Sequence, residues 1–312
     1  MKQILFLNPV FQQRIWGGRA LETKFGYEIP VGNIGECWGI SAHPNGESTI
    51  KNGIHAGLKL SDFWQNFPDF FGNPREKDFP LLTKILDANA DLSVQVHPDD
   101  AYAKKHENGE LGKTECWYVL DASPNAEIIF GHNAATKEEA ARMIDENKWD
   151  QFLKRIPIKK GDFFYVPSGT IHALCTGALI LEVQQSSDTT YRLYDYHRLD
   201  DTGKPRELHI KKSLDVSTIP HKSDTPSPVV VVDTEELAVV QLVSNEFFTV
   251  AKYVVRGCVK CQLGAGYALV SVIDGAGLLA GESVKKGDHL IIPAGMNEIE
   301  LDGSFEMIVA NP

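Results

Sequence analysis

An internal near-repeat constrains the fold of this chain more than any other feature. Residues Lys159–Gly169 read KKGDFFYVPSG, and residues Lys285–Gly295 read KKGDHLIIPAG. Each copy contains a Gly-Asp turn, a short run of β-prone side chains and a Pro-x-Gly turn. The alternative is an ordinary hairpin turn that recurs by accident, but the length of the match argues against it. Repeated units of this kind are typical of antiparallel β architecture, and two copies predict two related β-barrel domains.

The two copies differ just after the shared turn. His172 follows the first Pro-x-Gly, whereas the aligned position of the second copy is Glu298. We therefore predict a catalytic domain with short helical segments over residues 1–220. We predict a second β domain without a metal site over residues 229–312. The segment Asp215–Pro228 between them is rich in Ser, Thr, Asp and Pro, and it is predicted to be a linker.

Few helices are predicted. Thr136 can cap a helix over residues 137–144, with Glu139 completing a capping box. A second short helix is expected through residues 149–153, and Ser61 can cap another over residues 62–66. The segment after Pro98 is a further helical candidate. Much of the remaining chain is rich in β-branched and aromatic residues, so the chain is expected to be mainly β.

Charge and composition exclude several classes of function. The chain has 312 residues and a net charge of -11, which makes it a poor ligand for nucleic acid or an anionic membrane. A small-molecule substrate is favoured. The five cysteines show no disulfide framework, and Cys258 and Cys261 form a lone CxxC that we interpret as a chance pair. The N-terminus lacks a signal-peptide pattern, so a cytoplasmic location is expected. The sequence gives no prediction of oligomeric state.

Three short segments contain ligand-type side chains at strand positions. In the run Ser93–His97, Gln95 and His97 alternate with valines and therefore share one strand face. Glu115 follows Lys113 on a second predicted strand, and His172 follows the Pro-Ser-Gly-Thr turn. His97, Glu115 and His172 are expected to converge on one divalent ion, with Gln95 as a possible fourth ligand. Three protein ligands and an open position suit a catalytic zinc.

Each of these residues also has a simpler interpretation. A lone strand histidine such as His97 is usually a buried residue bonded to the backbone. The Lys113 and Glu115 face is usually solvated, and His172 alone would be a surface loop histidine. If Glu115 instead faces the interior, its buried charge requires a partner, which a metal ion would supply. The ligand interpretation is favoured because the three candidates occur together.

Two further charged residues are candidates for the same cavity. Glu182 lies in the apolar run ALILEVQ, and Arg192 lies in the run TTYRLYDY. An arginine is well suited to a phosphate or to a developing oxyanion, because its planar fork stays charged. A structural ion pair between Glu182 and Arg192 is the alternative.

Taken together, the motifs resemble those of the zinc-dependent type I mannose-6-phosphate isomerases in their short bacterial form. The resemblance extends over essentially the whole chain and is carried by these runs in this order: WGG from Trp16, GECWGISAHP from Gly35, QVHP from Gln95, KTECWY from Lys113, VPSGTIHAL from Val166 and YRLYDY from Tyr191. It implies two cupin-type (jelly-roll) barrels with a small helical insertion. It also implies interconversion of mannose 6-phosphate, a small phosphorylated sugar, and fructose 6-phosphate.

The resemblance assigns roles residue by residue. The zinc ligands map onto His97, Glu115 and His172, with Gln95 as the fourth, and one zinc ion per chain is expected. The catalytic arginine maps onto Arg192. Two further active-site residues of the family, a lysine and a glutamate, map onto the following positions: Lys113 and Glu182.

Aldose–ketose isomerisation moves a proton between C2 and C1 through an enediol, so a general base is required. Glu182 is the first candidate for that base and Lys113 the second. Two other functions fit the same residues. One is a sugar-phosphate-binding module with a structural metal. The other is a cupin oxygenase, since two histidines and one carboxylate also suit iron.

Overall fold

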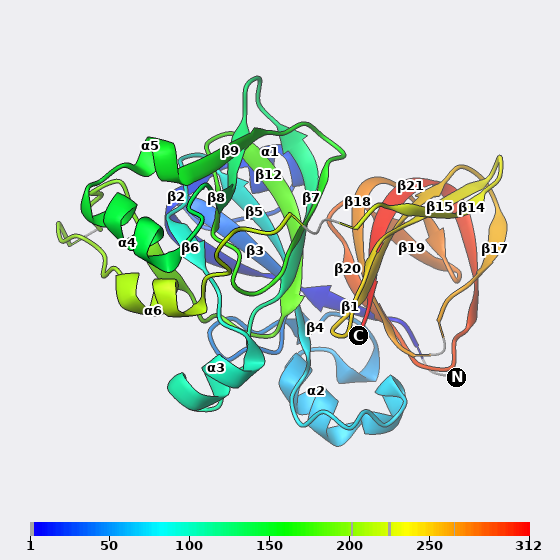
Figure 1. The fold of residues 1–312 in the computed structure, drawn as a ribbon. Helices are drawn as coiled ribbons and strands as arrows, with labels where there is room; N and C mark the ends of the chain where they lie inside the picture. The colour runs from blue at the N-terminus through cyan, green and yellow to red at the C-terminus, as the bar shows by residue number, and fades with distance from the viewer. Residues whose placement is uncertain (1–2, 201, 224–225, 265) are drawn as a thin grey trace.

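The computed structural model describes residues 3–200, 202–223, 226–264 and 266–312. The chain forms two β-rich bodies that lie side by side, with the helices within residues 137–152 and 210–216 at the outer end of the first (Figure 1). Every strand pair among the described residues is antiparallel. The predicted mainly β, antiparallel chain with few helices is confirmed. The barrel form of each body and the domain ranges 1–220 and 229–312 stay predictions.

The first body contains two sheets. A six-stranded sheet has the order β10-β7-β12-β5-β3-β2 and comprises Phe163–Val166, Glu115–Ala122, Ala178–Gln185, Leu81–Ala88, Ile34–Ile40 and Val10–Gly18. A five-stranded sheet has the order β13-β6-β11-β8-β9 and comprises Tyr191–Tyr194, Val94–Val96, His172–Leu174, Glu127–His132 and Leu153–Pro157.

The second body is one ten-stranded sheet whose main path is β14-β15-β16-β21-β18-β20-β1-β4. These strands are Val229–Asp233, Leu237–Ser244, Thr249–Val255, Glu298–Asn311, Ala268–Leu279, His289–Ile292, Leu5–Asn8 and Thr49–Ile50. The remaining strands, β17 (Val259–Gln262) and β19 (Glu282–Lys285), pair with β21 and β18. Strands β1 and β4 therefore belong to the second sheet, although they lie within residues 1–220.

The helices are short. They are α1 to α6 at Ala20–Phe25, Leu60–Asn66, Asp100–His106, Lys137–Asp145, Trp149–Phe152 and Ile210–Val216, with 3-10 turns η1 and η2 at Gly53–His55 and Pro68–Phe71. Thr136 caps α4, because its side chain accepts from Glu139 N. The Glu139 carboxylate accepts from Ala135 N rather than from the cap residue. The predicted Ser61 cap is wrong: α2 begins at Leu60, and Ser61 N donates instead to Glu47.

The shared turns of the near-repeat have the same geometry. Asp162 Oδ2 accepts from Lys159 N at 2.9 Å, and Asp288 Oδ2 accepts from Lys285 N at 2.9 Å. The glycine before each aspartate has φ 92°. Each turn leads into a four-residue strand, β10 or β20. The repeat in the sequence is therefore a repeat in the backbone.

The six-stranded sheet is buried on both faces. Its inner face, which includes Leu86, Trp117 and Ile180, is part of the core of the first body. Its outer face packs against the second body in one shared hydrophobic core, which includes Cys37, Ile85, Leu181, Leu242, Ile291 and Ile308. This shared core places β3 of the first body against β20 of the second.

The predicted linker does not run free between the bodies. Residues Asp215 and Val216 end α6, Ser217 is buried, and Thr218 N donates to Gly169 O at 2.9 Å. Residues 224 and 225 of this prediction lie outside the described residues. The five cysteines are free, and Cys116 and Cys175 are buried. None of the helices in the described part of the chain has the length and apolar character of a membrane span.

Candidate metal centre

Three buried side chains from separate segments meet in the first body. His97 follows β6, Glu115 begins β7 and His172 begins β11. Their candidate ligand atoms all lie within 4.8 Å of one another. His97 Nε2 lies 3.5 Å from Glu115 Oε2, and His172 Nε2 lies 3.4 Å from Glu115 Oε1. Among the described residues, this is the one such group of three potential metal ligands.

The backbone fixes the orientation of both imidazoles. His97 Nδ1 lies 2.9 Å from Thr189 O, and His172 Nδ1 lies 2.8 Å from Thr170 O. A carbonyl oxygen can only accept, so each Nδ1 carries the proton and each Nε2 keeps its lone pair. Burial lowers the pKa of His172 to about 4, and burial with the nearby Lys113 charge holds the pKa of His97 well below its usual range. Both rings are neutral and can donate the Nε2 lone pair to a metal ion, as metal coordination requires.

Two atoms of this cluster have unused bonding capacity. Glu115 Oε1 and His172 Nε2 are buried and lack a hydrogen-bond partner among the described residues. They face each other, yet both offer only a lone pair, so they cannot bond to one another. An unsatisfied buried acceptor costs roughly 1–3 kcal/mol, and more when it is charged. A divalent cation would satisfy both atoms, so this set of donors fits a metal ion.

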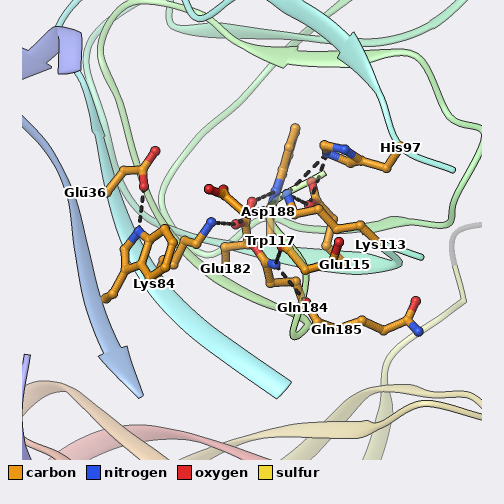
Figure 2. A network of polar contacts seen from close by, with 12 residues as sticks. Glu36, Lys84, His97, Lys113, Glu115, Trp117, Glu182, Gln184, Gln185 and Asp188 are labelled. Atoms are coloured by element: carbon orange, nitrogen blue, oxygen red, sulfur yellow. Dashed lines mark hydrogen bonds and ion pairs between the residues drawn. The ribbon is translucent and has the colours of Figure 1, made fainter. Parts of the chain in front are cut away.

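We call His97, Glu115 and His172 the metal-type cluster. Lys113 joins this cluster to a wider polar network, which Figure 2 shows. Its Nζ lies 2.6 Å from Glu115 Oε2, 3.2 Å from His97 Nε2 and 3.9 Å from Glu182 Oε1. Burial opposes its charge, but the Glu115 and Glu182 carboxylates outweigh burial and raise the pKa of Lys113 above its ordinary value. Lys113 and Glu115 are both buried, so the alternative of a solvated face is wrong.

Glu182 lies between two lysines. Its Oε1 is 3.7 Å from Lys84 Nζ, and its Oε2 accepts from Trp117 Nε1 at 3.0 Å. Burial, with the nearby Glu115 charge, raises the pKa of Glu182. Within the described residues, Glu182 has ion pairs with Lys84 and Lys113 and none with Arg192. The alternative Glu182–Arg192 ion pair is therefore wrong.

Gln95 and Arg192 lie in a row with His172 across the five-stranded sheet. Gln95 is the register partner of both His172 and Arg192. Directly paired residues of antiparallel strands point to the same face, so all three point to the face of the metal-type cluster. Arg192 Nη1 donates to Glu207 O at 3.0 Å, and its buried Nε lacks a hydrogen-bond partner in the part of the chain that the structure describes.

Comparison with known proteins identifies the family. Residues 4–122 match the phosphomannose isomerase type I catalytic domain, and residues 238–312 match the mannose-6-phosphate isomerase cupin domain. The chain is 51% identical to mannose-6-phosphate isomerase ManA of Bacillus subtilis over 98% of both chains. The chain belongs to the mannose-6-phosphate isomerase family. The resemblance found in the sequence is thereby confirmed.

Solved structures of this mannose-6-phosphate isomerase family share the fold. A crystal structure of the mannose 6-phosphate isomerase from Bacillus subtilis superposes with a TM-score of 0.97 at 47% identity, covering 100% of both chains. A more distant mannose 6-phosphate isomerase, bound with zinc and yttrium, superposes with a TM-score of 0.76 at 16% identity and covers 99% of both chains.

Lys84 and Trp38 are not among the residues predicted from the sequence, although both lie in the polar network. Lys84 Nζ lies 4.6 Å from the centre of the Trp38 ring, and both side chains are buried. A lone lysine in the apolar run LLTKILDA of β5 is the signal that could have found Lys84. Trp38 lies in the GECWGISAHP run, but nothing in that run indicates a lysine partner.

Proposed function

We propose that this chain interconverts mannose 6-phosphate and fructose 6-phosphate, using one zinc ion per chain. His97, Glu115 and His172 would hold the ion, with Gln95 as the fourth ligand. The observation that carries this proposal is a pair of buried lone-pair atoms without a hydrogen-bond partner among the described residues, Glu115 Oε1 and His172 Nε2, within a chain of this family. The zinc in the distant relative favours zinc over manganese, iron or cobalt, which the same donors accept.

The bound cation would supply Lewis-acid polarisation of the sugar oxygens, an effect worth several kcal/mol. The protein's own residues would do the rest. The isomerisation removes a proton from one sugar carbon and returns it to the neighbouring carbon. Lys113 and Arg192 would place positive charge where the enediolate oxygen or the phosphate carries negative charge. Because Arg192 has an unpartnered buried Nε, it has donor capacity left for an anionic ligand.

Glu182 remains the first candidate for the general base. Burial raises its pKa, which brings a carboxylate closer to the range useful for proton transfer at neutral pH. Lys84 and Trp117 fix the position of its carboxylate. Lys113 is the second candidate, but its ion pair with Glu115 at 2.6 Å favours the protonated ammonium. We therefore assign proton transfer to Glu182 and electrostatic stabilisation to Lys113.

The test combines metal analysis of the purified protein with a coupled assay for fructose 6-phosphate, before and after chelation. We expect about one zinc per chain, loss of turnover on chelation and recovery when zinc is added back. A metal-replete protein without turnover would favour the sugar-phosphate-binding module, and oxygen uptake with bound iron would favour the oxygenase. The cytoplasmic location and the absence of nucleic-acid and membrane partners stay predictions.

A further inference from the structure

A β-bulge lies on the strand that carries Trp38. In the pairing of β3 with β5, Trp38 is opposite Lys84 and Ile40 is opposite Thr83, so Gly39 is an extra residue. A bulge of this kind changes the direction of neighbouring side chains and is common beside active sites. The pairing places Trp38 on the same face as Lys84, and the Lys84 ammonium lies over the indole ring at 4.6 Å.

The second body packs directly on this bulge. A Cβ built on Gly39 would lie 2.3–2.5 Å from ring atoms of His289. His289, on β20, is 1% exposed, so no side chain larger than hydrogen fits at position 39 while the ring stays in place. On the other side of the bulge, Ser48, in the loop between β3 and β4, has its Oγ 3.3 Å from Trp38 O and 3.2 Å from Gly39 O. The bulge is therefore held by His289 and by this loop.

Hydrogen bonds fix the His289 ring. Tyr27 Oη donates its single proton to Gly287 O at 2.7 Å, so it can only accept from His289 Nε2, which is 3.1 Å away. His289 Nδ1 is then an acceptor for the Ser271 hydroxyl at 2.8 Å. Because both ring nitrogens are engaged, the ring has one orientation against Gly39.

We propose that His289 is a positioning residue of the active site, although it lies in the second body, whose described residues form no metal cluster. By packing behind Gly39, it holds the bulge that directs Trp38 across Lys84. Lys84 in turn lies 3.7 Å from Glu182, the proposed base. This inference rests on the proposed function. It means that a residue of the second body helps to position the active-site residues of the first.

A double-mutant cycle tests this route. We expect His289→Ala to lower kcat about tenfold in zinc-replete protein. In a Lys84→Met background, the same substitution is expected to change kcat less than twofold, because the residue through which His289 acts is already gone. Equal fold-losses in both backgrounds, or no loss in either, would overturn the proposal.

A control variant separates a positioning role of His289 from a general contribution to stability. Met307→Ala opens a cavity in the core of the second body, away from β3, and is expected to lower Tm with kcat unchanged. If His289→Ala does not fold, Ser48→Ala removes the hydroxyl that lies against the same bulge and enters the same cycle. An equal kcat loss for Met307→Ala and His289→Ala would contradict a positioning role.

A readout without turnover distinguishes this inference from the proposed function. We expect a crystal structure of the His289→Ala protein to show the Trp38 indole displaced from Lys84. An indole still in place over Lys84 would overturn the inference whatever the assay shows. A wild-type protein that fails to isomerise mannose 6-phosphate would instead count against the proposed function, while the displaced indole would still support the structural role of His289.

Discussion

In the first body the repeated turn Lys159–Gly169 leads to a buried histidine, whereas in the second body the matching turn Lys285–Gly295 leads to an exposed glutamate. The turns have the same aspartate cap, and the glycines that close them have φ 84° and φ 87°. His172 then faces Glu115 on β7, while Glu298 binds Gln262 at the surface. The comparison shows that the turn by itself does not make a site. A site forms only where another strand presents a complementary ligand.

The largest expected effect tests that difference directly. His172→Ala removes a proposed zinc ligand and should lower zinc content and kcat together, by at least about 100-fold in kcat, as loss of several kcal/mol of Lewis-acid stabilisation requires. The aligned substitution in the second body, Glu298→Ala, should change neither. Zinc analysis and the coupled assay on both variants decide the matter. Full activity of a zinc-free His172→Ala protein would contradict the site.

Arg192→Ala should come next in size. Loss of a charge placed near the developing oxyanion should lower kcat about 100-fold while zinc content stays full. The matched control is Arg256→Ala, an exposed arginine of the second body, which should behave like wild type. If zinc is lost from the Arg192→Ala protein, the residue is structural and the assignment fails.

Each body also contains a buried histidine with its pKa lowered to about 4, His172 in the first and His289 in the second. An unfolded histidine titrates near pH 6.5, so between pH 6.5 and 4 the unfolded chain binds more protons than the folded one. Stability is therefore complete above pH 6.5 and falls as the pH drops toward 4. The loss is at most about 3.4 kcal/mol per histidine, from a pKa lowered by roughly 2.5 at 1.36 kcal/mol for each pKa unit.

Denaturant unfolding of chelated protein across this pH range measures the effect. The slope against pH should be shallower in a His289→Asn variant, whose side chain does not titrate. The same slope in wild type and variant would show that His289 does not contribute. In zinc-loaded protein, acid should weaken stability further, because protons compete with the metal for His172.

The smallest effect concerns the glycines that end the two turns. A Cβ at Gly169 would lie 2.6 Å from Thr218 Oγ1, whereas a Cβ at Gly295 meets no atom of the described residues within 4 Å. Both positions have positive φ, which costs about 1–2 kcal/mol for alanine. Gly169→Ala should therefore lower the free energy of unfolding by about 1–3 kcal/mol more than Gly295→Ala does, since that is the typical cost of overpacking. Equal free energies of unfolding would mean that the Thr218 segment moves away without cost.

The metal-type cluster was predictable because its signals are local. Alternation places Gln95 and His97 on one strand face, and motif spacing places Glu115 and His172 near strand starts. The Ser61 cap failed because Glu47, from another segment, binds Ser61 N. The role of Lys84 depends on its contacts with Trp38 and Glu182 from neighbouring strands, and no local sequence pattern predicts these contacts.

By itself, the sequence determined the antiparallel β character, the repeated turns and the family, because short-range backbone preferences and motif order encode them. Only the tertiary structure decided that β1 crosses to the second sheet, that Lys84 joins Trp38 to Glu182, and that His289 packs behind Gly39. These contacts join residues far apart along the chain, and their geometry depends on strand register and on one bulge. Register depends on the hydrophobic patterns of both paired strands together, so no single short run of residues predicts it.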